Sequence, residues 1–297
     1  MFFRKKVKEK EEMETQAITN TQKEDFKNIL EFAKGLLDYD DRYKEFEKEN
    51  IYYFIKMLTD KMIYTNAIEL IKTYEGVKAL NIQNCFLENS SIIYDDITFS
   101  QFLEQNVIDT PISFDLESTA IITTPWEYGR LQNNFIDIHK DKWKQSESNH
   151  IGTLLLPMNL FIVENGNHSI FVGVVKHYGE FKINTPKSSG ANKAYDLSKL
   201  YDYIYCDGEY YRRKSDESII EPVKNFEFAC VFEIGRYILL YKKSEKKQEE
   251  YRKKIDFEKL EKDIERAKIE YEVIKEVRVK MKKLGVDDEI ITKVTGI

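Results

Sequence analysis

The sequence is poor in cysteine and has no long apolar run. Its three cysteines, Cys85, Cys206 and Cys230, are far apart and form no C-x-x-C pair, as is typical of reduced thiols inside a cell. No run of about 18 apolar residues is present, which excludes a membrane-spanning helix. Residues 1–6 lack the apolar segment of a signal peptide. We therefore expect a cytoplasmic protein with no membrane partner.

The chain also lacks the short motifs of three large enzyme classes. It contains no G-x-x-x-x-G-K-[ST] loop, no G-x-G-x-x-G turn and no G-x-S-x-G elbow, which excludes P-loop NTPases, Rossmann dehydrogenases and α/β-hydrolases. Proline is scarce, with five residues, while lysine, isoleucine, tyrosine and asparagine are abundant. This composition is typical of AT-rich bacterial genomes, and we expect a bacterial or phage source.

The net charge of the chain excludes one further class of function. A formal charge of −6 opposes a protein that coats nucleic acid through a general positive field. Residues 1–10 carry five basic side chains and residues 242–254 carry seven, and such segments could contact phosphate groups locally. Most segments of this kind are solvated surfaces, so contact with nucleic acid stays open.

The spacing of apolar residues divides the chain into three regions. Residues 1–76 show mostly helical spacing, residues 77–241 mix short apolar runs with helical spacing, and residues 242–297 return to helical spacing. Strands and helices that are mixed in this way are typical of the α+β class. We therefore predict an α+β fold with a central mixed-sheet module, a helical N-terminal region and a long C-terminal helix.

Helices are predicted from apolar spacing together with end signals. Thr21 with Glu24 has the pattern of a capping box, and Gly76 is a residue that ends helices. Asp109 and Pro111 would end a short helix in the centre of the chain. The predicted helices are residues 21–37, 42–74, 99–105 and 128–139.

Strands are predicted from short apolar runs and turn residues. Asp207-Gly208, between the runs 201–206 and 209–212, has the pattern of a two-residue β-hairpin. Residues 226–241 are largely apolar and fit either a hairpin or a buried helix, because periodicity does not separate the two. Further strands are predicted at residues 119–124, 151–156, 160–163 and 181–184.

The C-terminal region has the pattern of a long amphipathic helix. Apolar residues fall at alternating spacings of three and four, which is the pattern of a coiled-coil seam, and Arg278 interrupts it. Such a helix needs a partner surface, and packing onto the N-terminal helices and self-association with a second copy are equal alternatives. The seam residues are Phe257, Leu260, Ile264, Ala267, Tyr271, Ile274 and Met281.

The last residues, 284–297, resemble the short helical tails of bacterial mobile-element proteins. Gly285 is expected to end the long helix, Asp287 to cap a short one, and Thr295-Gly296 to end that one. The pattern is that of half a helix-turn-helix, so we do not expect this tail alone to read DNA.

One local pattern in the centre of the chain is the most informative. A short apolar run that predicts a buried strand is followed by Asn165-Gly166, which supplies positive φ angles for a sharp turn, and then by helical spacing. This order leaves the first N–H groups of the helix unpaired, and with the helix dipole they favour an anion such as phosphate. His168 and Ser169 would touch that anion. The alternative is a plain turn with Ser169 or Asn167 as the N-cap.

A proline-led strand, this turn, a histidine and an apolar helix together resemble the ParB/sulfiredoxin-like superfamily over residues 151–182. The signature turn of that superfamily reads approximately G-x-H-R, with serine here in place of the arginine. A sulfiredoxin has cysteine where Asn167 stands, so sulfiredoxin redox chemistry is not expected. The resemblance implies a module that binds a nucleotide such as CTP or ATP. The implied phosphate-contacting residues are Asn165, Gly166, Asn167, His168 and Ser169.

Several side chains near the turn could carry chemistry. His168 and Glu164 are the candidate catalytic residues, because a histidine at a helix N-terminus can act as a general base or as a donor to phosphate. Glu164 and His150 are the candidate helpers of His168, and Arg130 could supply the positive charge that Ser169 does not. The resemblance extends to nucleotide hydrolysis and nucleic-acid cleavage, and whether the chain is an enzyme stays open.

Aromatic and histidine residues give two further patterns. Trp126, Tyr128 and Trp143 near Arg130 could stack a base, or they could pack in the core. All four histidines fall within 39 consecutive positions, 139–177, and a hydrolytic metal would need three or four such ligands. No H-x-x-x-H or H-E-x-x-H spacing is present. The candidate metal ligands are Asp137, His139, His150, Glu164 and His168.

The sequence thus predicts a cytoplasmic protein with a ParB-like nucleotide- or phosphate-binding module. Association of this protein with DNA is left open. The first alternative is a non-enzymatic interaction protein that self-associates through its C-terminal helix. The second alternative is a metal-dependent nuclease that uses the histidine cluster. No particular cofactor is predicted.

Overall fold

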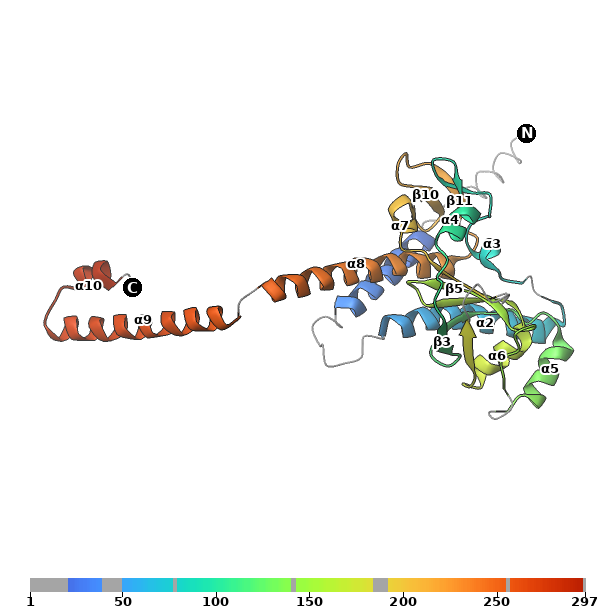
Figure 1. Cartoon of the computed structure of the whole chain (residues 1–297), viewed down its shortest axis with the longest axis horizontal. Helices are drawn as coiled ribbons and strands as arrows, with labels where there is room; N and C mark the ends of the chain where they lie inside the picture. Colours follow the sequence, from blue (N-terminus) through green and yellow to red (C-terminus); the bar gives the residue numbers. More distant parts are fainter. Residues whose placement is uncertain are drawn as a thin grey trace, which may run out of the picture. The chain divides into compact units, whose positions relative to one another are not determined.

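The computed structural model describes residues 21–38, 50–76, 79–139, 143–183, 192–254 and 257–295. It contains helices and mixed sheets, with helices at both ends of the described chain, and the predicted α+β class is confirmed (Figure 1). The chain divides into two compact units, residues 1–241 and 242–297. No helix among the described residues is long and apolar enough to cross a membrane.

The elements follow one another along the chain with short connections. The helices are the helix of residues 21–38, α2 (Asn50–Thr73), α3 (Ile82–Cys85), α4 (Phe99–Gln105), α5 (Tyr128–Asp137), α6 (Asn167–Val175), α7 (Leu200–Tyr203), α8 (Phe226–Lys254), α9 (Phe257–Lys283) and α10 (Asp288–Thr295). The strands are β1 (Ile92–Tyr94), β2 (Ile97–Thr98), β3 (Ile112–Asp115), β4 (Ala120–Ile122), β5 (Ile151–Leu156), β6 (Leu160–Asn165), β7 (Glu180–Ile183), β8 (Lys193–Asp196), β9 (Ile204–Cys206), β10 (Tyr210–Arg213) and β11 (Ile219–Pro222).

A mixed sheet of order β4-β6-β5-β8 forms the centre of the first unit. β4 is parallel to β6, β6 is antiparallel to β5, and β5 is parallel to β8. The described residues also form three smaller sheets, which are β1-β2, β3-β7 and β9-β10-β11. β6 therefore has a partner strand on each side, and its residues 160–163 are fully buried.

The central sheet separates two hydrophobic cores. Leu160 and Ile162 of β6 belong to a core shared with the helix of residues 21–38, α4 and the first half of α8. Phe161 and Val163, which alternate with them, belong to a core shared with α6 and with strands β3 and β7. Because successive side chains of a strand point to opposite faces, one apolar run supplies both cores. α4 and α6 accordingly lie on opposite sides of β5 (Figure 1).

Most of the predicted elements are confirmed, with ends that shift by one to a few residues. The strand expected at residues 119–124 is shorter, because Thr123 and Thr124 instead hydrogen-bond to Asn167. The helix expected at 42–74 is described only from Asn50 onward, since residues 39–49 lie outside the described chain.

Two assignments in the region of residues 201–241 are settled by packing. Residues 201–203 were expected in a strand and belong to α7, because the buried Tyr201 ring stacks on Phe232 at 4.7 Å and its hydroxyl donates to the Phe232 carbonyl at 2.8 Å. Residues 226–241 form a helix and not a hairpin. Gly235 lies inside this helix, where an added Cβ would be 2.2 Å from the Tyr201 hydroxyl oxygen.

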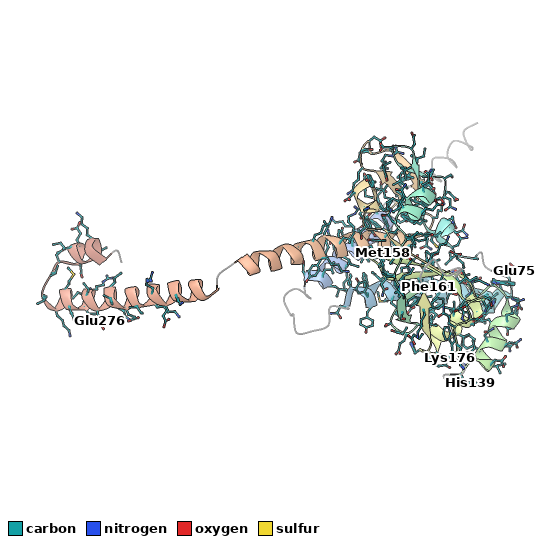
Figure 2. All side chains as sticks on the ribbon, in the orientation of Figure 1. Glu75, His139, Met158, Phe161, Lys176 and Glu276 are labelled. Carbon is teal, nitrogen blue, oxygen red and sulfur yellow. The ribbon has the colours of Figure 1, made fainter. Side chains whose placement is uncertain are left out.

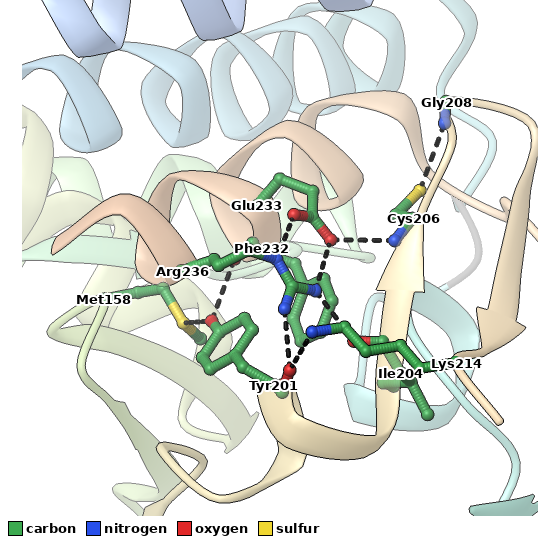
Figure 3. Close-up of polar contacts among 9 residues, drawn as sticks. All are labelled: Met158, Tyr201, Ile204, Cys206, Gly208, Lys214, Phe232, Glu233 and Arg236. Atoms are coloured by element: carbon green, nitrogen blue, oxygen red, sulfur yellow. Dashed lines mark hydrogen bonds and ion pairs between the residues drawn. The ribbon is translucent and has the colours of Figure 1, made fainter. Parts of the chain in front are cut away.

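A buried ion pair joins α8 to the α7–β9 segment (Figure 3). Arg236 Nε donates to Glu233 Oε2 at 2.6 Å, and the two side chains are 14% and 6% exposed. The same guanidinium donates to the carbonyl oxygens of Tyr201 and Ile204, both at 2.7 Å. Glu233 Oε1 in turn accepts from the backbone N–H of Cys206 at 2.7 Å. Each charge is therefore compensated by several hydrogen bonds, as burial requires.

Removal of one partner is expected to destabilise the first unit strongly. Glu233→Gln leaves the buried Arg236 charge without its counter-ion, and the cost of such a change is about 3–5 kcal/mol. Denaturation in urea measures the free energy of unfolding. Glu31→Gln is the matched control, because its ion pair with Lys27 is exposed and is worth about 0.5 kcal/mol or less. Equal losses for the two variants would contradict a structural role for the buried pair.

Candidate functional site

The predicted strand, turn and helix are present. β6 ends at Asn165, Gly166 has a φ of 82°, and α6 begins at Asn167. A Cβ at Gly166 would lie 2.6 Å from His150 Cδ2 and 2.7 Å from the Asn149 carbonyl oxygen. Glycine is therefore required by both the backbone angle and the space. Gly166 is the N-cap of α6 and no side chain caps the helix, so the alternative with Ser169 or Asn167 as N-cap is wrong.

Two side chains of the turn are directed at the segment that precedes α5. Asn167 Oδ1 accepts hydrogen bonds from Thr123 Oγ1 at 2.9 Å and from the backbone N–H of Thr124 at 2.8 Å. His168 Nε2 accepts from the backbone N–H groups of Trp126 at 3.3 Å and Glu127 at 3.1 Å. Both side chains are buried. They join the start of α6 to residues more than 40 positions earlier.

These contacts set the protonation state of His168. Because Nε2 accepts, the neutral ring carries its proton on Nδ1. Burial lowers the pKa of His168, the nearby Glu127 carboxylate raises it, and Arg130 lowers it, with burial the largest effect. The Nε2 lone pair is occupied by two N–H groups, so proton abstraction by Nε2 would first require residues 126–127 to move.

His150 and Ser169 form a hydrogen-bonded pair next to the turn. His150 Nδ1 accepts from the backbone N–H of Ser146 at 3.0 Å, so Nε2 carries the proton and donates to Ser169 Oγ at 2.7 Å. Ser169 Oγ donates to the Gly166 carbonyl at 3.1 Å. The His150 ring stacks on Trp143 at 5.2 Å. The proton therefore points from histidine to serine, opposite to the direction that activates a serine nucleophile.

Arg130 and Trp126 form the exposed surface beside the turn. Trp126 is 45% exposed, and its ring lies 5.4 Å from the ring of His168. The Arg130 guanidinium lies 5.2 Å from the centre of the Trp126 ring, and its Nε lies 3.6 Å from Glu127 Oε2. An aromatic face and a cation thus lie next to the first turn of α6, where the helix dipole also favours negative charge.

The remaining predicted residues lie elsewhere. Glu164 accepts a hydrogen bond from Thr153 Oγ1 at 2.9 Å. It shares a face of β6 with Ile162, opposite to the face that packs on α6, and therefore points away from the helix that carries His168. Asn165 is exposed and its Oδ1 accepts from the Gly166 N–H at 3.0 Å. Trp143 is buried, which removes it as a stacking surface for a ligand.

The histidines do not converge on a metal site within the described residues. His150 and His168 are used in hydrogen bonds to serine and to backbone N–H groups. His139 is exposed and lies near Lys176 (Figure 2), whose ammonium donates to the Ile138 carbonyl at 2.7 Å. No group of three or more His, Cys, Asp or Glu side chains in the described chain is arranged to hold an ion.

Three residues of the site were not predicted. Thr123 and Thr124 fix Asn167, and Glu127 caps α5 by accepting from the N–H groups of Gly129 and Arg130, both at 2.8 Å. Glu127 directly before a predicted helix was a signal that could have identified it as a cap. The threonine pair gave no comparable signal, because its partner is distant in sequence.

The geometry defines an α+β protein with a strand, a glycine turn and a helix that is uncapped by side chains. Residues 3–246 match the family described as "Family of unknown function (DUF6710)". The match covers most of the chain, and the chain belongs to this family. No curated protein and no solved structure matches the chain.

The two buried histidines are expected to make stability depend on pH. Burial lowers the pKa of His150 and of His168 in the folded state. The unfolded chain then binds protons that the folded chain does not, so the free energy of unfolding falls as the pH drops below about 6.5, the ordinary histidine value. Urea denaturation between pH 7.5 and 5.5 measures this loss.

A substitution separates this effect from general acid instability. His168→Asn retains a hydrogen-bond acceptor and removes the titrating ring, so its stability should fall less steeply with decreasing pH than that of the wild type. His139→Asn is the matched control because this ring is exposed. If the free energy of unfolding of His168→Asn changes with pH as steeply as that of the wild type, burial of the His168 ring has no energetic consequence.

Proposed function

We propose that the chain is a ParB-like nucleotide- or phosphate-binding protein of the bacterial or phage cytoplasm. In this proposal the phosphates of the ligand contact Arg130 and the N–H groups at the start of α6, and the base stacks on Trp126. The ligand is CTP or ATP, as the resemblance of the turn implies.

The observation that carries the proposal is the proximity of Arg130 and Trp126 to His168. These residues are about 40 positions apart, yet the guanidinium lies 5.2 Å from the indole, and the indole lies 5.4 Å from the ring of His168 at the start of α6. Arg130 provides the positive charge that Ser169, at the last position of the turn, does not. Its guanidinium can donate two parallel hydrogen bonds to a phosphate. No side chain caps α6, and the first N–H groups of such a helix favour an anion.

The turn supports binding better than it supports catalysis. Asn167 and His168 hold the 123–127 segment in place, and the catalytic candidates His168 and Glu164 hydrogen-bond to different partners, Glu127 N–H and Thr153 Oγ1. The proposal therefore assigns ligand binding to this surface and leaves turnover out of it. Because the backbone of the 123–127 segment is already held by Asn167 and His168, ordering that segment costs little when a ligand binds.

Isothermal titration calorimetry with CTP, ATP, ADP and inorganic phosphate tests the proposal. Arg130→Gln should weaken every phosphate-bearing ligand about tenfold or more, because a charge-assisted hydrogen bond is lost. Trp126→Ala should weaken the nucleotides by a similar factor through lost stacking, worth about 1–3 kcal/mol, and leave inorganic phosphate unchanged. Lys199→Gln, an exposed lysine outside this surface, is the control. Absence of binding by the wild type would remove the proposal.

One observation favours the oligomerising interaction protein as a second candidate. In α9, Ile269, Val273 and Val277 are 61%, 54% and 39% exposed and recur at every fourth position. Within the second unit, Ile274 and Met281 of the predicted seam are only half-exposed. An apolar stripe of this kind is stabilised by a partner helix, and a second copy of α9 has the matching stripe.

Light scattering on the full-length chain tests this candidate. The wild type is expected to be a dimer, and Val273→Glu is expected to shift it to a monomer because a charge would enter the apolar interface. Glu272→Gln is the control that should remain dimeric, because Glu272 directly precedes Val273 and is exposed. A monomeric wild type at all accessible concentrations would remove self-association through α9.

A further inference from the structure

A cavity opens on the face of the central sheet that is opposite to α6. Its volume is about 540 Å³, which lies within the range of about 300–1,000 Å³ that is usual for small-molecule sites. Thr153 of β5 and Tyr195 of β8 form its floor, and both are buried. Gln83, Ser100 and Leu103 form the wall that faces the sheet.

The polarity of this face changes along the strands. On β6, Leu160 and Ile162 are buried, and Glu164, the next residue on the same face, is exposed. On β8, Tyr195 is buried and Lys193, two positions earlier on the same face, is exposed. The same end of β6 and β8, the two strands that flank β5, thus changes from apolar to charged side chains where the cavity opens.

Hydrogen bonds fix the helical wall of the cavity in place. Thr98 and Gln101 form a capping box at the start of α4. The backbone N–H of Ser100 donates to the Asn89 carbonyl at 3.0 Å, and Gln83 Nε2 donates to Asn89 Oδ1 at 3.2 Å. The start of α4 is therefore held in place.

The other end of α4 is tied directly to β8. The backbone N–H of Asp196 donates to the Asn106 carbonyl, and that of Ile108 donates to the Ala194 carbonyl, both at 2.9 Å. The edge of β8 is thereby paired, and the distance between α4 and the sheet is set. A cavity with fixed walls needs little reorganisation to accept a ligand.

The charges around the cavity are of both signs and are not consumed by one another. Glu104 and Glu164 line one side, and Lys193 lies on β8. Within the described chain, neither carboxylate has a salt bridge, and the hydrogen bond recorded for Glu164 comes from Thr153. Burial, the largest effect, raises the pKa of Tyr195, and the nearby Lys193 ammonium lowers it. The phenol therefore remains protonated.

We propose that this cavity binds a small zwitterion of the amino-acid class, a free α-amino acid or a dipeptide. The ligand ammonium lies between Glu104 and Glu164, and its carboxylate accepts from the Lys193 ammonium and the Tyr195 hydroxyl. Ile82, Leu103 and Ile151 provide apolar contact for the ligand side chain. Charged groups of both signs in one fixed cavity match a ligand that carries both charges.

Calorimetry on the full-length chain with the twenty amino acids and a set of dipeptides tests the proposal. At least one is expected to bind, and Glu164→Gln and Lys193→Gln are each expected to weaken it about tenfold or more, because each removes a charge-assisted hydrogen bond. Glu75→Gln, an exposed glutamate outside the cavity (Figure 2), should leave affinity unchanged. Blocking either the amine or the carboxyl of the ligand should abolish binding.

Three outcomes would overturn the proposal. The first is that no zwitterion binds. The second is that the corresponding amine, which lacks the carboxyl group, binds as tightly as the amino acid. The third is that both Glu164→Gln and Lys193→Gln leave the affinity unchanged. Unfolding curves of each variant exclude loss of the fold as the cause of weakened binding. Arg130→Gln should not alter amino-acid binding, because Arg130 does not line the cavity, so this test is independent of the nucleotide proposal.

Discussion

Burial of β6 on both faces is the constraint on which the first unit depends. Its first four residues, 160–163, are apolar and alternate between two cores. A strand of this kind must have partner strands on both edges and packed layers on both faces, because its backbone and its side chains are all removed from water. β4 and β5 supply the edges, and the helices supply the layers. The places of α4 and α6 follow from this arrangement.

The end of β6 explains why the glycine turn is so firmly held. Once the strand leaves the core, Gly166 reverses the chain in a conformation that places α6 directly on the sheet. The side chains of Asn167 and His168 then lie against the segment that follows β4, where they accept the backbone N–H groups of Thr124, Trp126 and Glu127. Both histidines near the turn act as neutral acceptors. Residues that look catalytic in the sequence here satisfy buried backbone donors, as burial demands.

The same sheet exposes different chemistry on its two faces. Beside α6, the groups that reach solvent are an arginine and an indole, which suit an anion with an aromatic part. On the opposite face, carboxylates, an ammonium and a phenol surround a cavity. Glu164 belongs to the second surface although it lies four residues from His168. Glu164 is on β6, on the strand face opposite to α6, whereas His168 lies on α6 after the chain has turned at Gly166. Counting residues along the strand therefore does not predict the face on which His168 lies.

The sequence by itself determined the α+β class, the helices and strands with strong periodicity, and the glycine turn, because these depend on local propensity and on the period of apolar residues. It also identified Arg130 and Trp126 as residues of interest. It left residues 226–241 undecided between a hairpin and a helix, since Gly235 is explained only by Tyr201 and Met158 packed against it. Tertiary structure alone decided the proton positions on His150 and His168, the separation of Glu164 from the turn, and the cavity under α4. Each of these depends on contacts between residues distant in the chain, and such contacts leave no period in the sequence.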